Sequence, residues 1–281
     1  MNIVIFGSGS MGTRYRRLIS DYFPEHHWFN YVRIPDEPIG AQIRKRILRW
    51  IAPKDVAFIC NPTNHHIETA IACAEAGMHL FIEKPLDCDL SRLGQLKQTV
   101  AANHLTAYVA YPFRHDLTLN RTKEITDDAT SAEAVCYTDA RKWMKPYSRS
   151  MSTGGGALPE LSHEIDYMQY LFGEIVDITG NVGTDNLITD AEEWADLTLI
   201  HEGSRVTKVH LDLTSEKELR YLRIGRRRWN LSVTDEMYIR QLRYFFNNIG
   251  NPEIMNGLDE AGALIEKILA FREKAWTRLL P

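Results

Sequence analysis

The sequence contains no run of 18 apolar residues, whereas a helix that crosses a membrane needs about 20. Its first ten residues, MNIVIFGSGS, lack the basic segment and the long apolar stretch of a secretory signal peptide. None of the four cysteines belongs to a Cys-X-X-Cys pair. We therefore expect a protein with no membrane association, whose thiols stay reduced in the cytoplasm.

A strong excess of one charge is also missing. The 33 Lys and Arg residues stand against 37 Asp and Glu residues, which gives a net charge of −4 and a pI near 6.2. This balance does not favour nucleic acid or an anionic membrane surface as a partner. With 44% hydrophobic and 25% charged residues, the composition is that of a globular protein, and 281 residues suggest two domains.

Strand and helix signals alternate through the first part of the chain. Short apolar runs, each separated from the next by helical or polar segments, occur at 2–6, 27–32, 55–60, 78–82 and 106–110. Strands that are apolar throughout, with helices between them, are typical of a parallel sheet covered on both faces. We therefore predict a doubly wound α/β Rossmann domain over 1–111, with Asp89 as the N-cap of a helix that ends near Asn103.

The pattern changes after Tyr111. Single helices are predicted at 116–125 and 158–171, and two more close the chain at 236–248 and 258–278. Strand-like segments follow one another at 132–138, 175–182, 194–201, 206–214, 218–224 and 228–233. Consecutive strands without helices between them indicate an antiparallel sheet with one face partly open. We predict an α+β substrate domain over 112–281, and its open sheet face suggests a homo-oligomer.

A glycine motif follows the first strand and opens the first helix. Gly7, Gly9 and Gly12 fit the spacing Gly-X-Gly-X-X-Gly in the strand–turn–helix context that dinucleotide binding requires. The first glycine allows the tight turn, the second lets the backbone approach a pyrophosphate, and the third allows close packing of helix and strand. The predicted phosphate-binding residues are therefore Gly7, Ser8, Gly9, Ser10, Met11 and Gly12.

The end of the second predicted strand bears on the choice of cofactor. An acidic residue there would bind the ribose 2′-hydroxyl of NAD, but this chain has Arg33, and the next acid is Asp36. Because an arginine suits a 2′-phosphate, we favour NADP(H), while NAD(H) stays possible.

Four motifs in order resemble those of the Gfo/Idh/MocA oxidoreductase family. They are the glycine loop followed by Arg14, the stretch Asn61–His66, the tripeptide Glu83-Lys84-Pro85, and the stretch Gly154–Tyr167. The resemblance covers nearly the whole chain. It implies a Rossmann domain followed by an α+β domain with an open, mostly antiparallel sheet. It also implies hydride transfer between a nicotinamide cofactor and a carbinol or keto carbon of a sugar, nucleotide sugar or related compound, without a metal.

The resemblance also assigns residues to the cofactor and to catalysis. Asn61, Pro62, His66, Glu83 and Lys84 would help to bind the cofactor. Lys84, just after the fourth strand, lies at the carboxyl edge of the sheet, where ligands of open α/β sheets bind. There it would stabilise negative charge on the reacting oxygen.

His163 is the predicted proton-transfer residue. Many members of the family have an Asp four residues before this His, but this chain has Pro159 there and Glu160 one residue nearer. Residues three apart share a helix face, so Glu160 or Asp166 can orient the imidazole, and we assign Glu160 to catalysis. A metal site built from these three side chains lacks a second nearby His or any Cys, which argues against it.

Four further residues are predicted to contact substrate: Tyr111, Arg114, Trp143 and Asp166. Trp143 follows Arg141 and Lys142, and this trio is suited to a sugar or an anion. The alternative is that the trio is simply an exposed strand end.

The sequence therefore predicts an oxidoreductase that acts on a small, sugar-derived molecule. A nicotinamide-binding sensor or regulator of the same fold, without turnover, is the alternative. A third interpretation is an enzyme that reduces a C=N or C=C bond, in which His163 would matter less.

Overall fold

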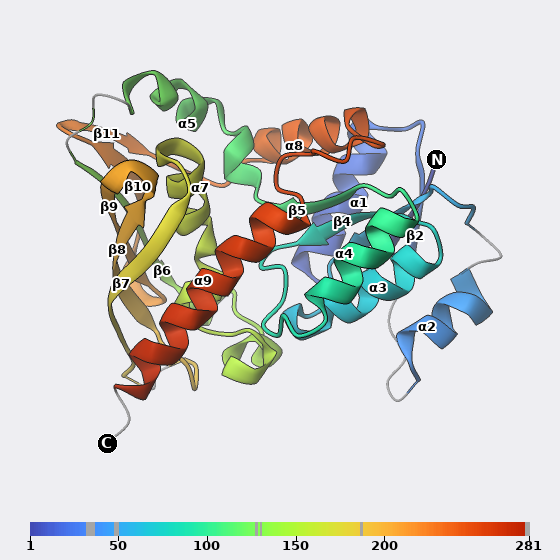
Figure 1. Cartoon of the computed structure of the whole chain (residues 1–281), viewed down its shortest axis with the longest axis horizontal. Helices are drawn as coiled ribbons and strands as arrows, with labels where there is room; N and C mark the ends of the chain where they lie inside the picture. Colours follow the sequence, from blue (N-terminus) through green and yellow to red (C-terminus); the bar gives the residue numbers. More distant parts are fainter. Residues whose placement is uncertain (32–36, 48–50, 127–128, 130, 186–187, 279–281) are drawn as a thin grey trace. The chain divides into compact units, whose positions relative to one another are not determined.

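The computed structural model describes residues 1–31, 37–47, 51–126, 129, 131–185 and 188–278 (Figure 1). The chain forms two compact units. The first comprises residues 1–110 together with 238–262, and the second comprises 111–237 together with 263–281. The first unit thus takes in 238–262, a segment that the sequence analysis placed with the second domain.

A five-stranded parallel sheet forms the centre of the first unit, as predicted. Its strands lie in the order β2-β1-β3-β4-β5. Their bounds are β1 (Asn2–Phe6), β2 (His27–Tyr31), β3 (Val56–Ile59), β4 (His79–Glu83) and β5 (Ala107–Ala110). Phe58, Phe81 and Tyr108 are neighbours across three adjacent strands, and all three are fully buried.

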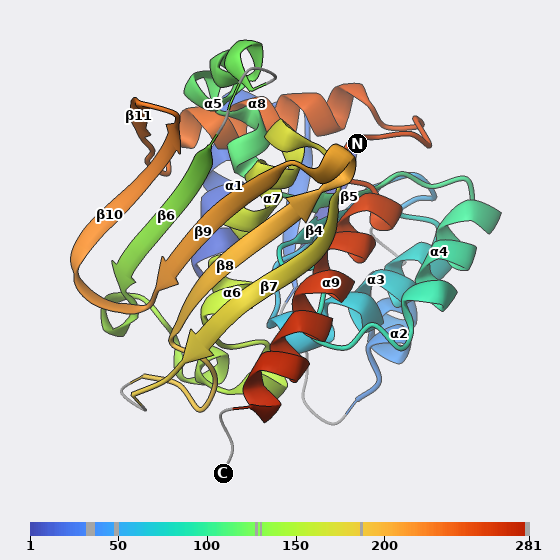
Figure 2. The ribbon, with the colours of Figure 1, turned by 60° about the vertical axis from the view of Figure 1, so that its left-hand side comes forward.

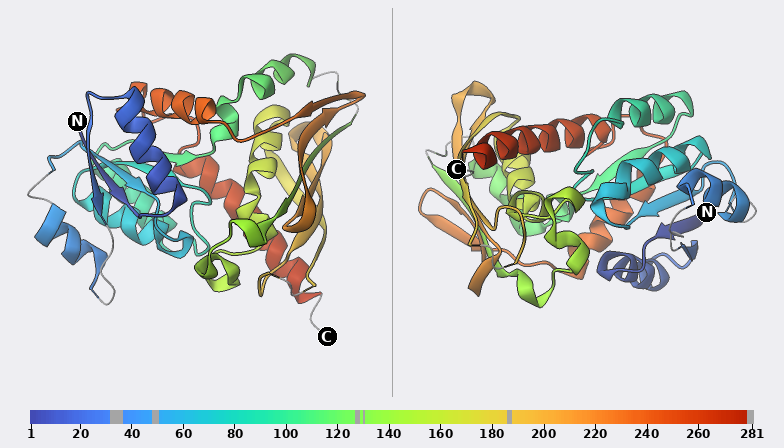
Figure 3. Two further views of the ribbon diagram at one scale, coloured as in Figure 1. Left: turned by 180° about the vertical axis from the view of Figure 1, so that it is seen from behind. Right: turned by 90° about the horizontal axis from the view of Figure 1, so that it is seen from below.

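Helices cover both faces of this sheet (Figure 3). Tyr15 of α1 and Phe245 of α8 pack against Phe81, with ring centroids 5.1 and 5.2 Å apart. Figure 3 shows α3 and α4 on the opposite face. The bounds are α1 (Ser10–Tyr22), α2 (Ile39–Gln42), a π-helical turn at Ile43–Ile47, α3 (His66–Glu75), α4 (Leu93–Ala102) and α8 (Asp235–Asn247).

One predicted helix start is wrong. α4 begins at Leu93 with Arg92 as its N-cap, and not after Asp89. The Asp89 carboxylate instead accepts a hydrogen bond from the Ser91 amide at 2.8 Å, so it stabilises the turn before the helix.

The second unit is built on a six-stranded sheet in the order β11-β10-β6-β9-β8-β7 (Figure 2). β6 and β9 are parallel, and all other pairs are antiparallel. The strands are β6 (Ala132–Asp139), β7 (Ile175–Gly183), β8 (Trp194–His201), β9 (Val206–Asp212), β10 (Thr214–Ile224) and β11 (Arg227–Asn230). Buried and more exposed residues alternate along β8 and β9, which confirms a sheet with one packed face.

Helices α6 and α7 lie behind this sheet in the view of Figure 2. The helices that contribute to the second unit are α5 (Leu117–Thr122), α6 (Ala157–Glu160), α7 (Ser162–Phe172) and α9 (Leu258–Thr277), of which α9 belongs to it from Ala263 onward. Across the described residues, no helix combines the length and apolar character that membrane crossing requires.

The helix predicted over 158–171 is in fact two helices, which meet at Leu161. Leu161 has φ −102° and ψ 25°, outside the α-helical region. The Ser162 hydroxyl donates a hydrogen bond to the Pro159 carbonyl at 2.9 Å. In a continuous helix that carbonyl would accept from the His163 amide, so the hydroxyl replaces a helical hydrogen bond where the helix breaks.

Candidate nucleotide-binding and catalytic residues

The turn between β1 and α1 requires glycine at two positions. Gly7 has φ 113°, and a Cβ there would overlap the carbonyl of Cys60 and lie 2.9 Å from the amide nitrogen of Asn61. A Cβ at Gly12 would in turn overlap the carbonyl of Gly7. The glycines therefore let the turn pack directly against the backbone that follows β3, as the motif predicts.

The N-terminus of α1 is suited to an anion. Its N-cap is Gly9, which has no side chain to cap the helix, and its first turn contains no acidic residue. Ser8, Gly9 and Ser10 are exposed. The first amide groups of a helix lack intrahelical acceptors and lie at the positive end of its dipole. This site fits the pyrophosphate of a dinucleotide.

Asn61 lies directly after β3 and is held by its side chain. Its Nδ2 donates to Thr69 Oγ1 of α3 at 2.9 Å. Its Oδ1 is buried and has no hydrogen-bond partner among the described residues. A buried acceptor without a partner is unfavourable, so this oxygen is suited to accept a hydrogen bond from a hydroxyl group of a bound ligand.

His66 is the first residue of α3 and is only 2% exposed. Its two ring nitrogens lie 2.8 Å from the carbonyl oxygen of Asn61 and 2.9 Å from that of Pro85. Burial lowers the pKa of His66, while Asp87 and the two carbonyls act in the opposite direction. Its direct contact with a cofactor stays a prediction, because both nitrogens face the protein's own backbone.

Glu83 and Lys84 lie at the carboxyl end of β4. The Tyr15 hydroxyl donates to Glu83 Oε1 at 2.6 Å, and both side chains are buried. Burial raises the pKa of Glu83 and raises that of Tyr15 well above its ordinary value. Lys84 is half-buried, so the tripeptide directs its acid into the unit while its lysine reaches the edge of the sheet.

In the second unit, His163 lies on α7 and is half-buried. Aromatic rings surround its imidazole. The Tyr111 ring lies edge-on, with centroids 5.9 Å apart, and the Phe113 ring lies 5.4 Å away. These contacts restrict the orientation of the imidazole ring.

Arg114 and Asp166 bind each other inside the second unit. Arg114 Nε lies 3.1 and 3.0 Å from the two carboxylate oxygens of Asp166, and its Nη2 lies 2.7 Å from Oδ1. Both side chains are buried. The pair links α7 to the segment that follows β5, a structural role that sequence analysis did not anticipate. Their contact with substrate stays a prediction.

Sequence analysis did not predict a second buried ion pair, which joins β10 to α7. Arg220 Nε of β10 lies 2.9 Å from Glu164 Oε1 of α7, and Arg220 Nη2 lies 3.0 Å from the Cys136 sulfur. Burial raises the pKa of Cys136 to about 12, so its thiol is neutral at physiological pH. No spacing rule connects residues so far apart in the sequence. Pairing of β10 with β6 places Arg220 opposite Cys136, and the packing of α7 against the sheet brings Glu164 to Arg220.

Glu192 and Arg272 organise the loop that precedes α6. Arg272 Nε donates to Glu192 Oε2 at 2.8 Å, and the Leu158 amide donates to Glu192 Oε1 at 3.0 Å. Gly156 has φ 116°, and a Cβ there would overlap both side chains. This buried pair therefore sets where α6 begins and, with it, where Glu160 ends that helix.

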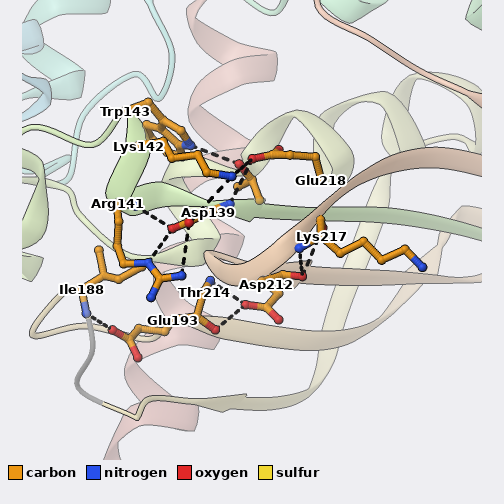
Figure 4. Close-up of polar contacts among 12 residues, drawn as sticks. Asp139, Arg141, Lys142, Trp143, Ile188, Glu193, Asp212, Thr214, Lys217 and Glu218 are labelled. Atoms are coloured by element: carbon orange, nitrogen blue, oxygen red, sulfur yellow. Dashed lines mark hydrogen bonds and ion pairs between the residues drawn. The ribbon is translucent and has the colours of Figure 1, made fainter.

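The two cations of the trio that follows β6 contact acidic side chains, and Trp143 contacts a threonine (Figure 4). Arg141 Nε donates to Asp139 Oδ1 at 2.7 Å, and Lys142 lies 3.7 Å from Glu218. The indole nitrogen of Trp143 donates to Thr138 Oγ1 at 3.1 Å, and the residue is 39% exposed. Both cations of the trio are thus paired locally, and Trp143 alone presents an apolar surface.

Within the described ranges, no group of three or more His, Cys, Asp or Glu residues is arranged to hold a metal ion. Arg33, on which the preference for NADP(H) rests, lies outside the residues that the structure describes.

Comparison with known proteins supports the resemblance found in the sequence. Residues 51–111 match the sequence model of an oxidoreductase family with an NAD-binding Rossmann fold, GFO_IDH_MocA. A myo-inositol 2-dehydrogenase of Thermotoga maritima is 27% identical over 125 residues, which cover 44% of this chain and 37% of that protein. The NADP(+)-dependent scyllo-inositol 2-dehydrogenase IolW of Bacillus subtilis is 24% identical over 151 residues, covering 52% and 42%.

A solved structure shows the same fold over the whole chain. The WlbA dehydrogenase of Bordetella pertussis, in complex with NADH and UDP-GlcNAcA, superposes with a TM-score of 0.77 at 14% identity. The match covers 97% of this chain and 96% of that one. The aligned part of this chain spans about half or less of the length of the curated relatives. The predicted fold class and the resemblance to the Gfo/Idh/MocA family are confirmed.

We expect the buried pair Arg114–Asp166 to stabilise the second unit. Replacing Arg114 with Met leaves the Asp166 carboxylate buried without its counter-ion, which should lower the free energy of unfolding by roughly 3–5 kcal/mol. Urea denaturation measures the change. Arg223→Met is the matched control, because Arg223 pairs with Glu133 at 2.6 Å but is half exposed, so a much smaller change is expected. Equal losses in the two variants would contradict the assignment.

Proposed function

We propose that this relative of the Gfo/Idh/MocA oxidoreductases transfers hydride between a nicotinamide cofactor and a carbinol or keto carbon of a sugar, nucleotide sugar or related compound. One observation carries the proposal. The first unit places an uncapped helix start, bounded by obligatory glycines, and the half-buried Lys84 at the carboxyl edge of one parallel sheet. A dinucleotide and a reacting oxygen both bind at that edge in open α/β sheets.

The residues that would hold the cofactor fit its chemistry. The amide groups at the start of α1 would bind the pyrophosphate, and Asn61 Oδ1 would accept a hydrogen bond from a hydroxyl of the nicotinamide ribose. The nicotinamide ring supplies the hydride acceptor or donor when it is bound. The relatives and the solved neighbour include both NADP and NADH binders, so the preference for NADP(H) remains a proposal that rests on Arg33.

Two side chains would act on the reacting oxygen, one by transferring its proton and the other by stabilising its negative charge. When an alcohol loses hydride, its oxygen must also lose a proton, and His163 would accept it. The Lys84 ammonium group would stabilise the negative charge that develops on the same oxygen. In the reverse direction, His163 would return the proton to the reduced carbonyl.

Glu160 is the proposed partner of His163. The other candidate, Asp166, is fully buried and already accepts three hydrogen bonds from Arg114. Glu160 is half-buried at the end of α6, and the break at Leu161 means that it does not share one continuous helix face with His163 of α7, contrary to the sequence-based expectation. The proposal therefore rests on the place of Glu160 three residues before His163 in the chain. Its carboxylate would stabilise the protonated imidazole.

The direct test is turnover of purified protein. NADPH and NADH absorbance should decay with at least one member of a panel of keto-inositols and keto-sugars. NADP⁺ should be reduced with the corresponding polyols. Tight cofactor binding without turnover on the whole panel would instead favour the sensor or regulator.

A cytoplasmic location and self-association through the open sheet face also stay predictions.

Lys84→Ala should reduce turnover by roughly 10²-fold, as removal of one oxyanion donor does in other enzymes. Cofactor affinity, measured by fluorescence titration, should change little, because the glycine loop is intact. Lys54→Ala is the control, since the Lys54 ammonium group donates to the carbonyls of Asn103 and His104. Normal turnover in the Lys84 variant would remove this lysine from the mechanism.

Glu160→Gln should lower the kinetic pKa assigned to His163. The carboxylate favours the protonated imidazole, so its loss makes His163 a weaker base and moves the rise in oxidation rate to lower pH. The pH dependence of kcat measures this shift, with Glu202→Gln, an exposed acid of the same unit, as the control. An unchanged profile would show that Glu160 does not act on His163.

Arg33→Ala should remove most of the preference for NADP(H). The guanidinium would bind the 2′-phosphate that NAD(H) lacks, so only NADP(H) affinity should fall. Fluorescence titration with both cofactors measures it, and Arg92→Ala, an exposed arginine of the first unit, is the control. Equal affinity of the native protein for the two cofactors would contradict the prediction.

A further inference from the structure

The first turn of α3 connects two loops that carry proposed functional residues. One loop follows β3 and contains Asn61, and the other follows β4 and contains Lys84 and Pro85. The ring of His66 bridges them, with Nε2 2.8 Å from the Asn61 carbonyl oxygen and Nδ1 2.9 Å from the Pro85 carbonyl oxygen. These loops follow adjacent strands of one parallel sheet, so the His66 bridge lies at the carboxyl edge of that sheet.

Only a donor can make this bridge. Both facing groups are carbonyl oxygens, which accept hydrogen bonds and cannot donate them. A neutral imidazole donates to one of them, and a protonated imidazole donates to both. His66 is 2% exposed, so water does not replace a missing donor there without opening the loops.

Two further contacts fasten the same loops to the same turn. Asp87 Oδ2, from the loop after β4, accepts from the Ile67 amide of α3 at 2.9 Å. Thr69 Oγ1 of α3 accepts from Asn61 Nδ2 at 2.9 Å. Each loop is therefore fastened to α3 by one of these hydrogen bonds and also faces a ring nitrogen of His66, and His66 is the one residue of this set that touches both loops.

We propose that His66 is a positioning residue that holds the loop of Lys84 in register with the loop of Asn61. The inference rests on the proposed function, in which Lys84 and Asn61 act on substrate and cofactor. This role does not depend on the predicted contact of His66 with a cofactor, because both ring nitrogens face backbone carbonyl oxygens. His66 acts on Lys84 through the carbonyl of the next residue in the chain, Pro85.

A double-mutant cycle tests whether His66 acts through Lys84. His66→Leu keeps much of the bulk and removes the donor, and it should lower turnover about tenfold or more. In the Lys84→Ala background the same substitution should cause no further loss, because effects transmitted through one residue are not additive. His66→Gln, which retains an N–H donor, should recover part of the activity. Additive losses in the double variant would overturn the proposal.

His79→Leu is the matched control. His79 is also buried in the first unit, but it lies at the other end of β4, where its Nδ1 accepts from the Thr106 amide at 2.9 Å. Any loss it causes should add to that of Lys84→Ala. If His66→Leu does not fold, Thr69→Val removes only the Asn61 fastening and should still increase the mobility of that loop in hydrogen exchange.

A measurement without turnover separates this inference from the proposed function. Amine acetylation by N-hydroxysuccinimidyl acetate, mapped by mass spectrometry, reports the environment of each lysine. In His66→Leu, Lys84 should react several-fold faster than in the native protein, while Lys54 should be unchanged. An unchanged Lys84 rate would overturn the positioning role even if the protein is an active dehydrogenase. A changed rate in a protein without turnover would uphold the positioning and contradict only the function.

Discussion

Buried polar side chains that must find partners determine where the functional helices of this protein lie. In the second unit, α7 has two acids inside the packed layer, and each has an arginine: Arg114 for Asp166 and Arg220 for Glu164. A charge left alone there would cost several kcal/mol, so both pairings constrain the position of the helix. His163 directly precedes Glu164 on α7, so the same pairings also place His163.

In the first unit, too, buried polar groups need partners, but the groups are different. Backbone carbonyls at the ends of β3 and β4 are the acceptors, and His66 of α3 is the donor between them. Glu83, which is directed inward, is held by the Tyr15 hydroxyl at 2.6 Å. Tyr15 belongs to the helix that begins at the glycine loop, so the buried carboxyl ties the end of β4 to α1. Residues at the carboxyl edge are thus held by partners that lie one layer deeper.

Glycine allows close packing against the backbone or side chains of another segment in both units of this protein. Gly7 packs on the carbonyl of Cys60, and Gly156 packs on the pair Glu192–Arg272. Both positions have positive φ, where other residues are strained, and both leave no room for a Cβ. One places the start of α1 beside the end of β3, and the other places α6 and Glu160. Glycine in this chain therefore does more than permit turns, since it sets the distance between segments that carry function.

Local patterns in the sequence determined the fold class of this protein. Apolar runs alternating with helices specified the parallel sheet, and the glycine spacing after the first run specified the phosphate loop. These features depend on neighbouring residues, whose periodicity and backbone preferences can be recognised directly. The two closing helices were found for the same reason, although the first unit also includes residues 238–262.

Tertiary structure alone decided the partners of the buried charges. Asp166 could be assigned to a helix face, but the sequence does not show that Arg114, 52 positions away, binds it. At the break at Leu161 the Ser162 hydroxyl binds the Pro159 carbonyl, whereas periodicity predicts a continuous helix there. The bridge by His66 requires two strands to end side by side, which no spacing encodes. Hydrophobic periodicity is a local property, whereas the pairing of polar groups is settled by which distant segments the packed core brings into contact.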